Sequence, residues 1–182
     1  MIILTYIILL AFIILVKDKH LTRKRAYDDT VRGDNMAYDT RELLARLIQC
    51  EAGGEGYDGM AAVASVVINR STIENGEFSR ISNGGNVRAI IEQPNQFTCL
   101  KTSVRGVYNS QNIYNMNPEE IHYRIADWAL AGNTASSVGN SLFFFNPYSE
   151  SCPNYFPNDI GVIYNRVGAH CFYAPTAKYA DT

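Results

Sequence analysis

The hydrophobic pattern divides the chain near residue 39. Residues 1–16, MIILTYIILLAFIILV, are almost wholly apolar, and the basic stretch KDKHLTRKR follows them. As a helix, the apolar run would span roughly 24 Å at about 1.5 Å per residue, slightly less than the core of a bilayer. Because positive charge follows the run and does not precede it, the pattern favours an uncleaved N-terminal membrane anchor over a signal peptide. A buried hydrophobic helix is the alternative.

Residues 17–38 are charged and polar, which is typical of a linker. The folded domain is therefore expected to span residues 39–182. That length suits one domain with a hydrophobic core and is too short for two.

Apolar residues at helical spacing predict the first two helices of this domain. The first begins at a cap at Asp39 or Thr40 and ends at the glycine pair that starts with Gly53. One face of it carries Leu44, Leu47, Ile48 and Glu51. The second helix is expected from Gly59, after a cap at Asp58, to about residue 70. Small residues keep it slim, so that neighbouring elements can pack closely: Ala61, Ala62, Ala64 and Ser65.

Two further helices and a β region complete the expected fold. The segment 86–92 forms a third helix that ends before Pro94. A fourth runs from a cap at Asn117, with Pro118 in its first position, to Leu130. The segments SLFFFNP and GVIYNRVGAHCFYA are rich in aromatic and β-branched residues, which favours strands. The pattern thus predicts an α+β, mostly helical domain with a small C-terminal β or irregular part.

The composition argues against a nucleic-acid binder. Lys and Arg number 16 and Asp and Glu 18, so the net charge is −2 and no basic face is indicated. Twelve tyrosines and an asparagine-rich second half suit a polar groove with stacking surfaces for a sugar chain. The same residues also suit loops and edge strands.

Cysteine and histidine spacing predicts neither a metal site nor a cofactor. The four cysteines contain no CxxC pair, the three histidines (His20, His122 and His170) are scattered, and no HExxH is present. Cys152 and Cys171 flank one compact segment and are the first candidates for a disulfide, whereas the alternative is four free cysteines. A Cys171–His170 nucleophile pair is disfavoured, because adjacent strand residues point to opposite faces.

The carboxylate of Glu51 is the strongest candidate for catalysis. It shares an apolar helical stripe, so burial should raise its pKa, and the helix ends directly after it, so that it can face a cleft. A protonated carboxylic acid is what cleavage of a glycosidic bond requires. Glu55 is a second candidate, as a secondary polar or basic group. The structural alternative for Glu51 is a carboxylate near a helix end, held by backbone amides or by an arginine such as Arg46 or Arg70. For Glu55 it is an acid before a helix N-terminus, where the helix dipole favours it.

Four segments, in order, resemble the SleB/CwlJ-type cell wall hydrolases, the spore cortex-lytic enzymes. EAGGEGYDGMAAVASVVINR is similar to the family signature that begins E-A-R-G-E, and IIEQPNQFTCL, SLFFFNP and RVGAHCFY are similar to its later motifs. The likeness covers about residues 40–174. It implies a lysozyme-like domain that cleaves peptidoglycan glycan strands, with Glu51 as the catalytic acid. Gly53 and Met60 depart from the family's usual arginine and glutamine, which puts substrate preference in doubt.

The same motifs supply candidate substrate-binding residues. Amide and hydroxyl side chains can hydrogen-bond N-acetyl groups and sugar hydroxyls, and an aromatic ring can stack on a sugar. The candidates are Gln93, Asn95, Gln96, Phe97, Thr98, Asn146 and His170.

The sequence therefore predicts a monomeric enzyme, without a metal or organic cofactor, that cleaves the bond between N-acetylmuramic acid and N-acetylglucosamine as a lytic transglycosylase or a muramidase. Its partners are peptidoglycan and, through residues 1–16, a membrane at the bacterial cell envelope or spore. A wall-binding module without catalysis and an N-acetylmuramoyl-L-alanine amidase are the rival hypotheses, and the amidase generally requires a zinc site.

Overall fold

The computed structural model describes residues 38–182, of which Asp39–Thr182 form one compact unit. The expected anchor, residues 1–16, lies outside the described residues, as does all but the last residue of the expected linker. Within residues 38–182, no helix has the length and apolar character needed to cross a membrane.

The first two helices carry the segment around Glu51. Helix α2 (Thr40–Ala52) begins as predicted, because the side chain of Asp39 accepts the backbone N–H of Glu42 at its N-terminus. Helix α3 (Gly56–Thr72) begins three residues earlier than predicted. Gly56 adopts a left-handed conformation with φ of 67° and completes the turn after α2, so the two residues that follow it already lie in the helix.

Three further helices follow. Helix α5 (Val87–Glu92) confirms the prediction for 86–92, whereas α4 (Gly76–Ser82) was not predicted. Helix α6 (Glu120–Leu130) starts later than the expected cap at Asn117. The reason is a capping box in which Glu119 accepts from the backbone of His122, while Nδ1 of His122 accepts from the backbone of Glu119 at 3.0 Å.

The predicted β region is a four-stranded antiparallel sheet in the order β3-β6-β5-β4. Its strands are β3 (Phe143–Phe145), β4 (Tyr155–Phe156), β5 (Gly161–Val167) and β6 (His170–Pro175). A small hairpin that was not predicted consists of β1 (Ser103–Val104) and β2 (Val107–Tyr108). Short 3₁₀ turns are η1 (Thr98–Leu100), η2 (Ile113–Asn115), η3 (Pro157–Asp159) and η4 (Ala177–Asp181).

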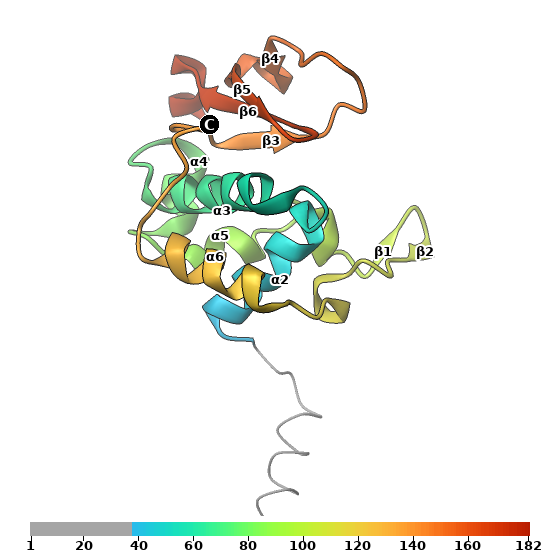
Figure 1. Ribbon diagram of the computed structural model, residues 1–182. Helices are drawn as coiled ribbons and strands as arrows, with labels where there is room; N and C mark the ends of the chain where they lie inside the picture. The colour runs from blue at the N-terminus through green and yellow to red at the C-terminus, as the bar shows by residue number, and fades with distance from the viewer. Residues whose placement is uncertain (1–37) are drawn as a thin grey trace, which may run out of the picture. The chain divides into compact units, whose positions relative to one another are not determined.

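Helix α3 lies between the sheet and the other helices (Figure 1). It is buried on nearly every side, and its small residues Ala62, Ala64 and Ser65 have no exposed surface. This is the close packing that their size predicted. The turn between α2 and α3 contacts the sheet at the start of β6 and at the turn before it, through Glu55 with His170 and Ala169.

A disulfide joins Cys152 to Cys171. It confirms the first candidate from the sequence and ties the loop before β4 to β6. Cys50 and Cys99 are free thiols. Because Cys171 is bonded to another sulfur, it cannot serve as a nucleophile with His170.

Candidate active site

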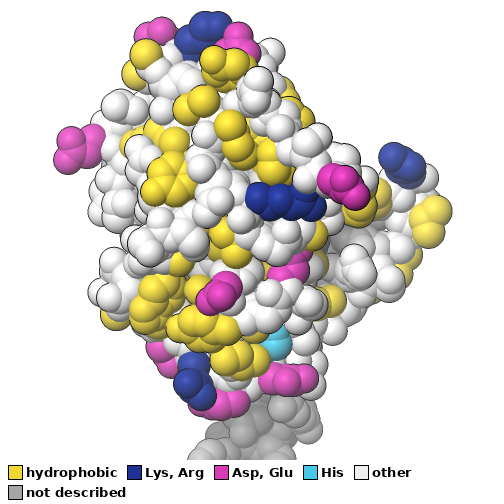
Figure 2. All heavy atoms as spheres, turned by 45° about the horizontal axis from the view of Figure 1, so that its top comes forward, with side chains coloured by type: hydrophobic (Ala, Val, Ile, Leu, Met, Phe, Trp, Pro, Cys, Tyr) yellow, Lys and Arg dark blue, Asp and Glu magenta, His cyan; other side chains and the backbone are white. Residues whose placement is uncertain are grey.

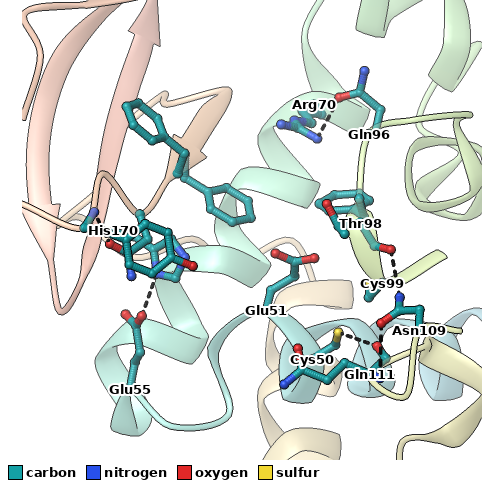
Figure 3. A pocket seen from close by; sticks show the side chains of 15 residues that line it. Cys50, Glu51, Glu55, Arg70, Gln96, Thr98, Cys99, Asn109, Gln111 and His170 are labelled. Carbon is teal, nitrogen blue, oxygen red and sulfur yellow. Dashed lines mark hydrogen bonds and ion pairs between the residues drawn. The ribbon is translucent and has the colours of Figure 1, made fainter. Parts of the chain in front are cut away.

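A cavity of about 500 Å³ lies where the end of α2, the loop after α5 and the sheet meet (Figure 3). Its walls come from segments that are far apart in the chain. The lining residues are Cys50, Glu51, Glu55, Arg70, Gln96, Phe97, Thr98, Cys99, Asn109, Gln111, Phe144, Phe145, Asn146, Tyr148 and His170.

Glu51 occupies the middle of this cavity, with its carboxylate directed into the space between the two walls (Figure 3). Its helix is anchored by Leu44, Leu47 and Ile48, which are fully buried on the same face. Glu51 itself is half-buried. The local pattern therefore carries the side chain to the rim of the core, as the sequence predicted.

Burial raises the pKa of the Glu51 carboxyl above its ordinary value. A hydrogen bond with the Cys99 thiol and the charges of His170 and Arg70 act in the opposite direction with smaller effect. The net result is a carboxylic acid that keeps its proton to a higher pH than an exposed glutamate. A raised carboxyl pKa is what general acid catalysis near neutral pH requires.

Glu55 lines the same cavity but has its own partners. Its Oε1 atom lies 2.7 Å from Nδ1 of His170, and its Oε2 atom accepts the backbone N–H of Ala169 at 3.3 Å. Both Glu55 and His170 are largely shielded from solvent. The pair joins the N-terminus of α3 to the turn between β5 and β6, and so holds one wall of the cavity together.

Arg70 is a second structural support of the site. Its Nε donates to the carbonyl of Leu142 at 2.7 Å, and its guanidinium lies over the ring of Phe78 at 4.5 Å and over that of Phe97 at 5.3 Å. Burial lowers the pKa of Arg70 to about 10, so the side chain remains charged at neutral pH. The alternative partner suggested by the sequence, Arg46, pairs with Glu42 at 2.5 Å.

The residues that follow α5 line two separate hollows. Gln96, Phe97 and Thr98 line the cavity of Glu51. Gln93 and Asn95 instead line a separate hollow of about 340 Å³, which shares Phe97 with the first.

Gln93 also has a partner within the domain, because its Nε2 atom donates to Oε1 of Glu77 at 2.6 Å. The structure thus brings Gln96, Phe97 and Thr98 to Glu51 and leaves Gln93 and Asn95 outside its cavity.

The sheet side of the cavity carries the other two candidates, Asn146 and His170. Oδ1 of Asn146 accepts the backbone N–H of Tyr148 at 2.8 Å, so this residue also forms the turn after β3. Tyr148, Asn109 and Gln111 line the cavity and were not predicted. They lie in irregular segments, where no periodic pattern marks them.

Glu51 also lines a second hollow, of about 570 Å³. It shares Cys50, Glu51, Glu55 and Gln111 with the first cavity. Gly53 and Met60, which depart from the resembled pattern, both line this second hollow and not the first.

Comparison with known proteins places the chain in a family. The family model described as Cell Wall Hydrolase matches residues 54–173. This chain belongs to the cell wall hydrolase family. Among curated relatives, the cell wall hydrolase CwlJ of Oceanobacillus iheyensis is 32% identical over 136 residues, which are 75% of this chain and 86% of CwlJ. CwlJ of Bacillus subtilis is 29% identical over 140 residues, covering 77% and 88% of the two chains.

Solved structures of the cell wall hydrolase family agree with the fold. The catalytic domain of the Bacillus cereus SleB protein has a TM-score of 0.54 at 25% identity, covering 77% of this chain and 93% of that domain. The catalytic domain of SleB from Bacillus anthracis has a TM-score of 0.52 at 24% identity, covering 76% and 98%. The expectation that this sequence is a SleB/CwlJ-type cell wall hydrolase is confirmed.

Proposed function

We propose that this cell wall hydrolase cleaves the glycosidic bond between N-acetylmuramic acid and N-acetylglucosamine in peptidoglycan, with Glu51 as the catalytic acid. One observation carries the proposal: Glu51 lines two hollows, of about 500 and 570 Å³. A glycan strand that crossed Glu51 would place sugars in both hollows and the bond between them at the carboxyl group.

The chemistry needs a proton on Glu51 before the bond breaks. In its acid form, Glu51 donates that proton to the glycosidic oxygen, the bond from this oxygen to C1 of the muramic sugar breaks, and N-acetylglucosamine leaves with a new hydroxyl group. The C6 hydroxyl of the muramic sugar, or a water molecule, then bonds to C1 and returns a proton to the Glu51 carboxylate. The raised pKa of Glu51 supports the first step.

The surroundings of Glu51 supply groups that suit a sugar chain. Gln96, Thr98 and Asn146 offer amide and hydroxyl groups, and Phe144 and Tyr148 offer aromatic surface. Charged side chains of both signs are scattered over the face in Figure 2 and form no continuous patch there.

The proposal includes the place of action. A bacterial cell envelope or spore is the location that we infer, with residues 1–16 as the membrane anchor. The anchor, the monomeric state and the choice between spore cortex and vegetative wall stay predictions.

Digestion of purified peptidoglycan tests the reaction. The full chain and a Glu51→Gln variant are incubated with vegetative and cortex peptidoglycan, and the fragments are analysed by mass spectrometry. Anhydro-muramic ends identify a transglycosylase and reducing ends a muramidase, and both support the proposal if Glu51→Gln produces neither. Free stem peptides would identify an amidase instead. Co-sedimentation with the wall without any products would identify a binding module.

A further inference from the structure

Two thiols share the cavity with the carboxylate of Glu51. The Sγ atoms of Cys50 and Cys99 and an oxygen of Glu51 all lie within 4.8 Å of one another. Cys50 and Glu51 are consecutive near the end of α2, and Cys99 belongs to the 3₁₀ turn η1 on the opposite wall. Figure 3 shows all three side chains around the same space.

Neighbouring groups hold both thiols in place. Sγ of Cys50 donates to the backbone carbonyl of Gln111 at 3.2 Å, and Sγ of Cys99 lies within 4.8 Å of both Sγ of Cys50 and a carboxylate oxygen of Glu51. Cys99 is only 2% exposed. The rest of the domain therefore keeps the two sulfur atoms next to the carboxylate.

This set of ligand atoms suits a zinc-like cation. Thiolate ligands favour Zn²⁺ over Mg²⁺ and Ca²⁺, and zinc also accepts carboxylate oxygen. With zinc–sulfur distances of about 2.3 Å in a tetrahedron, two bound sulfur atoms lie about 3.8 Å apart. Spacings below 4.8 Å reach this geometry through small side-chain movements.

We propose that Cys50, Cys99 and Glu51 bind one thiophilic divalent cation, represented by Zn²⁺, and that this cation holds the enzyme inactive. Three protein ligands leave a fourth position for water from the cavity. Cation binding displaces the protons of the two thiols. A carboxylate that is bound to the cation cannot carry the proton for the leaving oxygen, so the bound state is a resting state. The inhibitory part of this inference rests on the function proposed for Glu51, but the binding part does not.

The spacing of cysteines in the sequence did not predict such a site. Cys50 and Cys99 are far apart in the chain and belong to no CxxC pair. The fold brings them together because residues 98–100 pack against the end of α2.

Cobalt binding tests the site without any measurement of activity. The full chain is purified without metal under argon, its free thiols are counted by a thiol reagent, and Co²⁺ is added. Two free thiols and a thiolate-to-cobalt charge-transfer absorption are expected, and Zn²⁺ should abolish this absorption by displacing Co²⁺.

Single substitutions assign the ligands. The variants Cys50→Ser and Cys99→Ser should lose the charge-transfer absorption or weaken Zn²⁺ binding by more than about 100-fold, since loss of an outer-shell partner alone costs about 10- to 100-fold. Glu51→Gln should retain the absorption but bind Zn²⁺ at least about 10-fold more weakly. Glu55→Gln is the matched control, because Glu55 lines the same cavity outside the three-ligand group, and it should bind Zn²⁺ as the wild type does.

The inhibitory role is measured in the same preparations. Added Zn²⁺ should reduce peptidoglycan cleavage in proportion to the occupied fraction of sites, and a chelator should restore the rate. In Cys50→Ser, whatever its own metal-free rate, the same Zn²⁺ concentration should cause no further loss.

Four results would overturn the inference. The first is an absence of free thiols, which would mean a Cys50–Cys99 disulfide, and the second is two free thiols without a cobalt absorption band. The third is a Zn²⁺ affinity that is unchanged in Glu51→Gln. The fourth is a rate of peptidoglycan cleavage that increases with Zn²⁺. If Zn²⁺ binds as described and the protein cleaves no glycan, the binding site stands and the proposed function fails.

Discussion

The imidazole of His170 and the carboxylate of Glu55 meet at 2.7 Å, although one belongs to the last strand of the domain and the other to the turn before α3. Both residues line the cavity that contains Glu51. Glu55 therefore holds His170 and the turn before it in position next to Glu51. Its place in the reaction stays a prediction that substitution can test.

Replacement of Glu55 by alanine should lower the rate of glycan cleavage by about 10- to 100-fold, since small displacements in a catalytic cavity have effects of this size. Glu55→Gln keeps a hydrogen-bonding group and should recover most of the rate. Initial rates on soluble glycan fragments, compared at matched pH, provide the measurement. If the Glu55→Gln variant is as inactive as the Glu55→Ala variant, Glu55 acts through its charge and takes a direct part in the chemistry.

Gly168→Ala should destabilise the domain by about 1–3 kcal/mol for its backbone conformation alone. Gly168 has a φ of 59°, and a Cβ atom there would collide with Oε2 of Glu55. Urea denaturation measures the loss. Gly84→Ala is the control, because Gly84 also has a positive φ, of 88°, but no atom within 4 Å of an added Cβ. Equal losses in the two variants would show that the contact with Glu55 has no energetic weight.

Glu51→Gln should reduce glycan cleavage by about 100- to 10,000-fold, the usual contribution of a general acid. Product release from labelled peptidoglycan measures the effect. Glu74→Gln is the matched control, since Glu74 is exposed and outside the cavity, and it should retain the full rate. Residual cleavage above one-tenth of the wild type would remove Glu51 from the role of acid.

The same substitution should stabilise the fold at neutral pH. Folding raises the pKa of Glu51. At any pH between the pKa of Glu51 in the unfolded state and its pKa in the folded state, the native state therefore binds more protons. The free energy of unfolding falls as the pH rises through this window. Glu51→Gln removes that dependence. Its melting temperature should exceed that of the wild type at pH 7, and the difference should shrink toward pH 4. A difference that stays constant with pH would contradict the raised pKa.

Reduction of the disulfide between Cys152 and Cys171 should cost about 3 kcal/mol of stability, from the loop entropy of its 19-residue separation. Urea unfolding of the wild type with and without reductant measures this loss. The Cys152→Ser variant should have the stability of the reduced wild type, both with and without reductant. If reductant shifts the Cys152→Ser curve as much as the wild-type curve, the effect does not come from this disulfide.

Local signals were enough to predict the position of Glu51. The cap at Asp39, the stripe formed by Leu44 and Leu47, and the glycine pair from Gly53 all lie within one short segment, and each acts through its neighbours in the chain. The aromatic segments likewise predicted strands β3, β5 and β6.

The features that the sequence did not reveal depend on distant residues. Helix α4 starts with backbone N–H groups that are satisfied by the hydroxyls of Tyr179 and Thr182, at 2.9 and 3.1 Å, and no local cap marks its beginning. The same reason explains why the contact of Glu55 with His170 and the approach of Cys50 to Cys99 escaped prediction. Periodicity describes one segment at a time, whereas these contacts arise from packing between segments.

The assembly of the cavity from the two ends of the domain has a consequence during synthesis. Glu51 leaves the ribosome with the first helix, but His170 and the aromatic wall of β3 emerge only after most of the domain has been translated. An unfinished chain carries the acid without the surface that would seat a saccharide beside it. The cavity beside Glu51 is therefore complete only after the whole domain has been translated.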